Sequence, residues 1–300
     1  MSLVPTATTR DFGRTAVRFT PSARSYIASA TDWYDVWATS VGSEFTCRIA
    51  SLLHETPTSA DKATFLDRIR SAMMPSDGPA PPLPLLEHVS TLQATDWLRA
   101  SMTTFAQSVG SVLPGHFESY ARVYHPFQYN DGNTTEAPTW RELAAAAGVD
   151  LNDAGVFDSL RASVEPHAYV DIGSLPRALS DLLVAHLAPA TSTPDRCFFA
   201  VWEGFGASAV PRTVAPTLEL PERRYHVFSG PAAGARTSFS VISFHHQSAN
   251  LWWPADHAWC VATEVDLSWT YIGGARACIQ SLLADGRIDA VETKATAKAG

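Results

Sequence analysis

The spacing of apolar residues changes near residue 196, and this change constrains the fold more than any other feature of the sequence. After it, short β-branched and aromatic runs bounded by Gly or Pro are typical of strands. These runs are 197–204, 225–230, 237–244 and 258–267. Before it, apolar residues recur every three or four positions, which is typical of amphipathic helices. That spacing predicts helices at 60–73, 95–110, 140–148 and 175–187.

Helices followed by strands predict an α+β fold. We expect a helical N-terminal half, with residues 45–187 mainly helical, packed on an antiparallel β-sheet formed by about residues 197–267. A C-terminal helix is predicted at 275–285. Thr95, Thr139 and Ser174 are the predicted N-caps of three helices, and Thr139 with Glu142 matches a capping box.

Proline divides the chain. Five of the ten residues at 75–84 are proline, which is typical of an extended linker. The predicted organisation is therefore an N-terminal helical region at 1–74, which could belong to the same core, and an α+β domain at 85–290. Residues 291–300 contain no core residues, and we expect them to be a disordered tail.

Composition excludes several classes of function. The net charge of −8 argues against a broad nucleic-acid surface, which needs clustered Lys and Arg. A membrane span is not expected, because there is no run of about 18 apolar residues. The N-terminus lacks the apolar segment of a secretion signal, and the four cysteines include no CxxC pair. These features predict a cytoplasmic protein, and no cofactor is predicted.

The stretch 250–274, NLWWPADHAWCVATEVDLSWTYIGG, holds four of the nine tryptophans and two acids near its centre. On a strand at 258–267, Glu264 and Asp266 share one face, with Cα atoms roughly 6.5–7 Å apart, beside small residues that leave space. Such a pair is suited to general acid and base catalysis. The alternative is that both acids end a strand in water or bond to Arg and backbone N–H groups.

Glu203 is the third candidate catalytic acid. It follows the aromatic run at 197–202, and Gly204 and Gly206 allow a tight turn beside it. The alternative is a simple hairpin turn. Glu203 and Glu264 both follow aromatic strands, so they would lie at the same end of the sheet if those strands are next-but-one neighbours. We expect any functional site where Glu203, Glu264 and Asp266 approach one another.

The candidate binding residues are Trp252, Trp253, Asp256, His257 and Arg276. Arg276 follows Gly273-Gly274 in the first turn of a predicted helix, where free N–H groups could hold an anion. His245, His246, Asp256 and His257 are possible metal ligands, but a metal would need several of them to converge from different segments. No metal site is predicted.

Three segments resemble a group of uncharacterised proteins of high-GC Gram-positive (actinobacterial) bacteria. They are VLPGHFESYARVYHP at 112–126, CFFAVWEGFG at 197–206 and LWWPADHAWCVATEVDLSWTYIGG at 251–274, and the resemblance covers roughly residues 110–290. It implies no activity, cofactor or catalytic residue. Leu113-Pro114 and Phe117 also resemble the helix entry of the SUKH superfamily, which implies an α+β fold and a toxin-binding immunity role.

The leading hypothesis is therefore a non-catalytic recognition protein that presents an acidic, tryptophan-rich surface to another protein, with no nucleic acid or membrane as partner. One alternative is a hydrolase using the carboxylates of Glu203, Glu264 or Asp266. A hydrolase should bring at least two of these acids into one concave pocket. The other alternative is a structural subunit of a larger assembly, which should show a broad apolar patch.

Overall fold

The computed structural model describes the C-terminal two thirds of the chain. Described are residues 83, 85–102, 107–129, 138–152, 160, 168–206, 208–211, 214–242 and 245–299, and the backbone of a strand pair, β1 (Thr6–Ala7) with β2 (Val17–Arg18). The helix predicted at 60–73 and the proline-rich linker up to residue 82 lie outside these residues. Apart from the strand pair, so does the predicted N-terminal region at 1–74.

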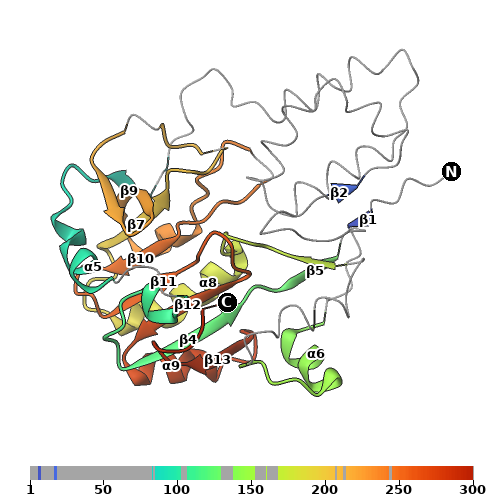
Figure 1. The fold of residues 1–300 in the computed structure, drawn as a ribbon. Coiled ribbons are helices and arrows are strands. Elements are labelled where there is room, and N and C mark those ends of the chain that lie inside the picture. The colour runs from blue at the N-terminus through green and yellow to red at the C-terminus, as the bar shows by residue number, and fades with distance from the viewer. Residues whose placement is uncertain are drawn as a thin grey trace, which may run out of the picture.

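A nine-stranded antiparallel sheet organises the described part of the chain (Figure 1). Its order is β13-β4-β12-β11-β10-β7-β9-β3, and β8 pairs with β9 beside this path. The strands are β3 (Glu87–His88), β4 (Ser119–Tyr124), β7 (Cys197–Trp202), β8 (Thr217–Leu220), β9 (Arg223–Gly230), β10 (Leu251–Pro254), β11 (Trp259–Ala262), β12 (Trp269–Gly274) and β13 (Ala290–Thr293). A separate pair joins β5 (Phe127–Tyr129) to β6 (Ala168–Val170).

The predicted helical half packed on a sheet of residues 197–267 is wrong. The sheet takes β3 and β4 from before residue 196 and β12 and β13 from after residue 267. β4 lies between β12 and β13, so a strand that is distant in sequence is part of the sheet. Its residues are buried on both faces, which hides the period-2 alternation of a half-exposed strand. The predicted strand at 237–244 is also wrong, because residues 232–236 form a 3₁₀ helix and 237–242 lie in irregular structure.

Among the described residues, four α-helices cover the sheet or its margins. They are α5 (Asp96–Ser101), α6 (Trp140–Ala147), α8 (Arg177–Leu187) and α9 (Arg276–Leu283). α6 begins with the predicted capping box: Thr139 Oγ1 accepts from Glu142 N at 3.1 Å, and Glu142 Oε2 accepts from Thr139 N at 2.8 Å. Ser174 is not a cap. Its hydroxyl donates to the His246 carbonyl at 2.8 Å, and α8 starts after Pro176.

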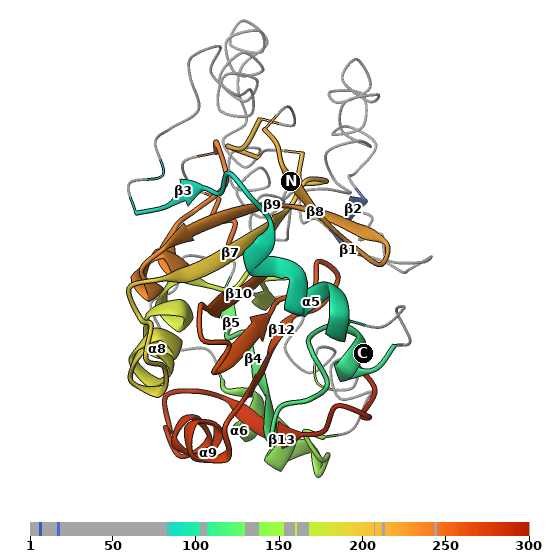
Figure 2. The same ribbon diagram turned by 90° about the vertical axis from the view of Figure 1, so that its left-hand side faces the viewer.

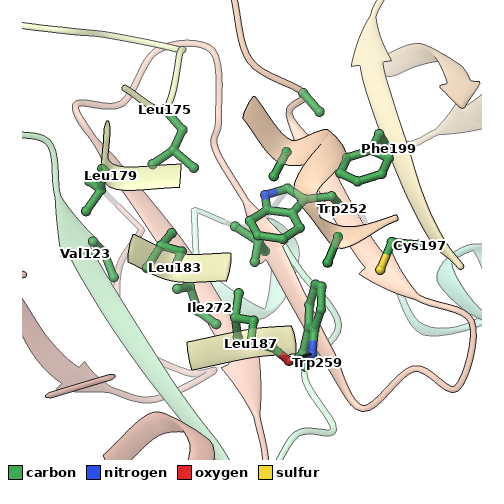
Figure 3. Packing of buried hydrophobic residues seen from close by; sticks show 14 of the residues in the cluster. Val123, Leu175, Leu179, Leu183, Leu187, Cys197, Phe199, Trp252, Trp259 and Ile272 are labelled. Atoms are coloured by element: carbon green, nitrogen blue, oxygen red, sulfur yellow. Dashed lines mark hydrogen bonds between the residues drawn. The ribbon is translucent and has the colours of Figure 1, made fainter. Parts of the chain in front are cut away.

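Apolar side chains are buried on both faces of the sheet. On β11, Trp259 and Val261 join the cluster under α8 and α9, whereas Cys260 and Ala262 join the cluster under α5. Figure 2 shows α8 and α5 on either side of the strands. In the first cluster, leucines of α8 pack on Trp259 and Ile272 (Figure 3), and Trp259 Nε1 donates to the carbonyl of Leu187 at 2.8 Å. Trp259 and Val261 are fully buried.

The end of the chain, predicted to be disordered from 291, is instead part of the fold. Residues 290–293 form β13, which pairs antiparallel with β4 at the edge of the sheet. Beyond β13, the backbone of Ala299 donates to the Gln107 carbonyl at 2.9 Å, and its side chain is buried. No helix of the described residues is long and apolar enough to cross a membrane.

Candidate functional site

The strand order decides where the predicted acids lie. β7 and β11 both pair antiparallel with β10, so they run parallel to each other and end at the same end of the sheet. Glu203 follows β7, and Glu264 follows β11. Their partners are consecutive residues of β9: Arg224 Nε donates to Glu203 at 2.7 Å, and Arg223 Nη2 donates to Glu264 at 2.6 Å.

Consecutive residues of a strand point to opposite faces. Arg223 therefore lies on the face of the buried Tyr225 and Val227, which belong to the cluster under α5, and Arg224 lies on the other face. Glu203 and Glu264 share an end of the sheet, but each is bound to an arginine on a different face. The structure brings Glu264 and Asp266 together and leaves Glu203 apart from them.

Glu264 and Asp266 line a pocket of about 220 Å³, which we call the acidic pocket. Its charged residues are Glu222, Arg223, Glu264 and Asp266. Three carboxylates against one guanidinium leave an excess of negative charge. Its other walls are largely apolar and come from the residues after α5, the β8–β9 hairpin, β10, the segment between β11 and β12, and the end of the chain. They are Met102, Val112, Leu220, Leu251, Leu267 and Ala299.

Arg223 is held firmly inside this pocket. Its guanidinium lies 5.3 Å from the centre of the Trp202 ring, and its Nη2 lies 3.7 Å from Asp266 as well as 2.6 Å from Glu264. Burial lowers the pKa of Arg223, but the hydrogen bond and charge of Glu264 outweigh it and raise the pKa. Asp266 is 78% exposed and lies at the rim, whereas the Glu264 side chain is only 16% exposed.

Tyr225 and Asn250 supply neutral groups to the wall of the pocket. Burial, together with the charge of Glu264, raises the pKa of Tyr225, so its phenol stays protonated. The Asn250 side chain joins two elements: its Oδ1 accepts from Trp202 N at 2.9 Å, and its Nδ2 donates to the Thr263 carbonyl at 3.1 Å. These bonds fix the residues that follow β11 relative to β7.

A buried polar chain extends from Thr263 on the opposite face. Thr263 Oγ1 lies 2.7 Å from Thr270 Oγ1, which lies 3.0 Å from Nε2 of His125, and Nδ1 of His125 lies 2.7 Å from the Asp171 carbonyl. Burial lowers the pKa of His125 to about 4, so the ring is neutral at physiological pH. Since Nδ1 can only donate to a carbonyl, Nε2 accepts from Thr270.

The predicted binding residues do not form one surface. Trp252 and Trp253 are almost fully buried, at 1% and 0% exposure, and act as core. Asp256 orders a loop: burial opposes its ionisation, but hydrogen bonds from Ser192 and Thr191 outweigh burial and lower the pKa of Asp256 to about 2.

Arg276 and His257 have local partners instead of a shared ligand site. Arg276 Nε lies 3.4 Å from Glu118, which also accepts from Arg276 N, so a carboxylate already occupies the start of α9. His257, with φ of +58°, stacks on Trp97 at 4.4 Å between ring centres. His116 packs edge-on against the same indole.

Sequence reasoning missed Trp97, His116 and Arg223. Trp97 lies in the stretch predicted to be helical at 95–110, and nothing in the sequence links it to His257, 160 residues away. The paired arginines at 223–224 precede the run predicted as a strand, and their opposite-face placement follows only from strand pairing.

A second constellation was also missed. Ser281 of α9 lies 3.0 Å from Nδ1 of His186 of α8, and Nε2 of the same ring lies 2.9 Å from Asp285. Arg287 donates to both oxygens of Asp285. These are the residue types of a serine hydrolase triad, but with the two ring nitrogens exchanged relative to the common arrangement.

Metal coordination finds no support in the described segments. No group of three or more His, Cys, Asp or Glu side chains there could hold a metal ion. The three cysteines in that part of the chain, Cys197, Cys260 and Cys278, are buried and unpaired. Burial raises the pKa of the Cys197 thiol to about 12, so it does not act as a thiolate at neutral pH.

Comparisons with known proteins leave the geometry as the sole guide to function. No protein-family model, curated protein sequence or solved structure matches this chain.

Proposed function

We propose that the protein is a non-catalytic recognition module that binds a partner protein by taking a lysine or arginine side chain of that partner into the acidic pocket. The observation that carries the proposal is the charge of the pocket. Glu222, Glu264 and Asp266 face a single arginine there, and apolar walls can receive the methylene stem of a long cationic side chain.

The position of Arg223 favours recognition over hydrolysis by a carboxylate pair. Its Nη2 lies within 2.6 Å of Glu264 and 3.7 Å of Asp266, so a guanidinium group takes the place that a water or substrate would need between two catalytic acids. Glu203 cannot replace either acid, because it is bound to Arg224 on the other face of the sheet.

The immunity-type role suggested by resemblance stays a prediction and agrees with this proposal. A structural subunit has less support. Among the described residues, Leu85 is the only large hydrophobic side chain that is exposed, so that part of the chain offers no broad apolar patch for assembly.

Calorimetric titration with two small probes tests the proposal. N-acetyl-lysine methylamide should bind the protein, and N-acetyl-norleucine methylamide, which lacks the charge, should bind at least fivefold more weakly. The double variant Glu222→Gln/Asp266→Asn removes two exposed rim charges and should weaken lysine binding about fivefold or more. Asp181→Asn, on α8 across the sheet, is the matched control. Equal affinity for both probes would contradict the proposal.

A second candidate is acyl hydrolysis at Ser281, favoured by the hydrogen bonds from Ser281 to His186 and from His186 to Asp285. His186 would take the serine proton, while Asp285 holds the ring. Diisopropyl fluorophosphate tests it. Labelling of Ser281 that disappears in His186→Asn would support hydrolysis, and an unlabelled serine would leave the three residues as a tie between α8 and α9.

A further inference from the structure

Arg122 is a buried cation that no carboxylate neutralises within the described residues. It lies in the middle of β4, is 3% exposed, and its Nε has no hydrogen-bond partner. Its guanidinium packs 5.3 Å from the centre of the Trp269 ring and 5.7 Å from that of Tyr271, and Nη1 donates to the Tyr124 hydroxyl at 3.3 Å. Buried charges are normally paired, because desolvation is costly. An arginine placed so suggests a site for an anion.

The C-terminal segment, residues 294–299, covers this arginine. Nη2 of Arg122 donates to the Lys298 carbonyl at 3.3 Å. The Ala299 carbonyl accepts from the Tyr271 hydroxyl at 2.7 Å and from Trp269 Nε1 at 3.1 Å. A neutral carbonyl oxygen, that of Lys298, thus takes a position where a carboxylate would bind the guanidinium more strongly, since charge-assisted bonds to arginine are about twice as strong as neutral ones.

The C-terminal segment lies along residues 107–110 and bonds to them through its backbone, as a bound peptide would. Val109 N donates to the Ala297 carbonyl at 2.9 Å, Gly110 N to the Ala295 carbonyl at 2.8 Å, and Ala299 N to the Gln107 carbonyl at 2.9 Å. Side chains alternate: Lys294, Thr296 and Lys298 are exposed, and the three alanines point inward. Backbone bonds and three methyl groups therefore hold most of the segment, and little apolar area opposes its release.

We propose that the groove between residues 107–110 and Arg122 binds the carboxyl end of an extended peptide from a partner protein, and that residues 294–299 fill it when no partner is present. The peptide would add alongside residues 107–110 through its backbone, with small side chains at alternate positions, as in strand addition. Its terminal carboxylate would replace the Lys298 carbonyl at Arg122 and the Ala299 carbonyl at Tyr271 and Trp269. This site is separate from the cation recognition proposed above, although Ala299 borders both.

The test uses the full chain and a fluorescent peptide, acetyl-Ser-Ala-Thr-Ala-Ser-Ala, with either a free or an amidated carboxyl end. Serines replace the two lysines, so that no cationic side chain can enter the acidic pocket, and failure of one proposal leaves the other standing. Fluorescence anisotropy should show that the acid binds at least tenfold more tightly than the amide.

Variants of the chain test two points: whether residues 294–299 compete with the peptide, and whether Arg122 and Tyr271 contact it. Ala295→Trp is too large for the space where Ala295 lies against Gly110 and Gly115, and should undock the segment, so the acid peptide binds at least tenfold more tightly than to the parent. Lys298→Ala removes only an exposed side chain and should leave affinity unchanged. Tyr271→Phe keeps the ring but loses the donor, and should weaken binding several-fold. Arg122→Gln should abolish the preference for acid over amide.

Two results would overturn the proposal. One is equal binding of acid and amide by the parent and by Ala295→Trp, with unfolding temperatures close to that of the parent. The other is concentration-dependent dimerisation that the peptide does not reverse, since this would show that a second copy of the chain is the occupant.

Discussion

Glu203 and Glu264 lie at the same end of the central sheet and bind adjacent arginines that point to opposite faces of it. The pairing order β7-β10-β11 brings the two acids to one end, and the alternation of β9 keeps them apart. A site that the sequence could place at one end of a sheet is therefore confined to one face, with Glu264 and Asp266 inside and Glu203 outside.

The two salt bridges should differ in their contribution to stability. Glu264→Gln leaves the guanidinium of Arg223, only 28% exposed, without its closest carboxylate, and should lower the free energy of unfolding by about 1–3 kcal/mol. Glu203→Gln affects Arg224, which is 57% exposed, and should cost less than about 1 kcal/mol. Urea unfolding measures both, and a larger loss for Glu203→Gln would contradict the assignment of the buried face.

Trp259, the aromatic residue of β11, should contribute strongly to stability. Its ring is fully buried, and its Nε1 holds the end of α8 through the Leu187 carbonyl. Trp259→Ala should lower the free energy of unfolding by about 3–5 kcal/mol. Trp202→Ala should cost less, because that ring is only partly buried. Thermal unfolding of Trp259→Ala that matches the parent would exclude the packing shown in Figure 3.

His125 should make stability depend on pH in mildly acidic solution. Burial lowers its pKa in the folded chain to about 4 from an ordinary 6.5. Between these values the unfolded chain takes up a proton that the folded chain does not, so stability is full above pH 6.5 and falls as the pH drops towards 4.

His125→Asn should therefore reduce the slope of unfolding free energy against pH in that window by up to about 1.4 kcal/mol per pH unit. His116→Asn, at an exposed position, serves as the control. Unfolding curves collected from pH 7.5 to 4 provide the measurement, and an unchanged slope in His125→Asn would mean that this histidine is not buried as a neutral ring.

Structural features that depend on residues close together in the chain were predictable from the sequence. The capping box of Thr139 and Glu142 and the helix near 276–283 follow from patterns within a few residues. The small residues of β11 were expected to leave open space above the sheet, but that face is largely core, because α5 and the end of the chain cover it.

Most of the wrong predictions concern residues whose partners are distant in sequence. β4 pairs with β12 although 155 residues separate Ser119 from its partner Gly274, and no spacing rule in one sequence encodes that pairing. Asp256 and Arg276 were read as binding residues, but loops distant in sequence supply their partners, Thr191, Ser192 and Glu118. Arg223 likewise binds Glu264, which is distant in sequence, and this contact was not predicted.

Nuclear magnetic resonance mapping tests the central claim most directly. In two-dimensional ¹H–¹⁵N spectra titrated with N-acetyl-lysine methylamide, the largest shifts should occur at the Asn250 side-chain amide and at the backbone amides of Glu222, Arg223 and Glu264, and N-acetyl-norleucine methylamide should leave them nearly unchanged. Shifts that gather instead around Trp97 and His257, or that are the same for both compounds, would contradict the assignment of the acidic pocket as the recognition site.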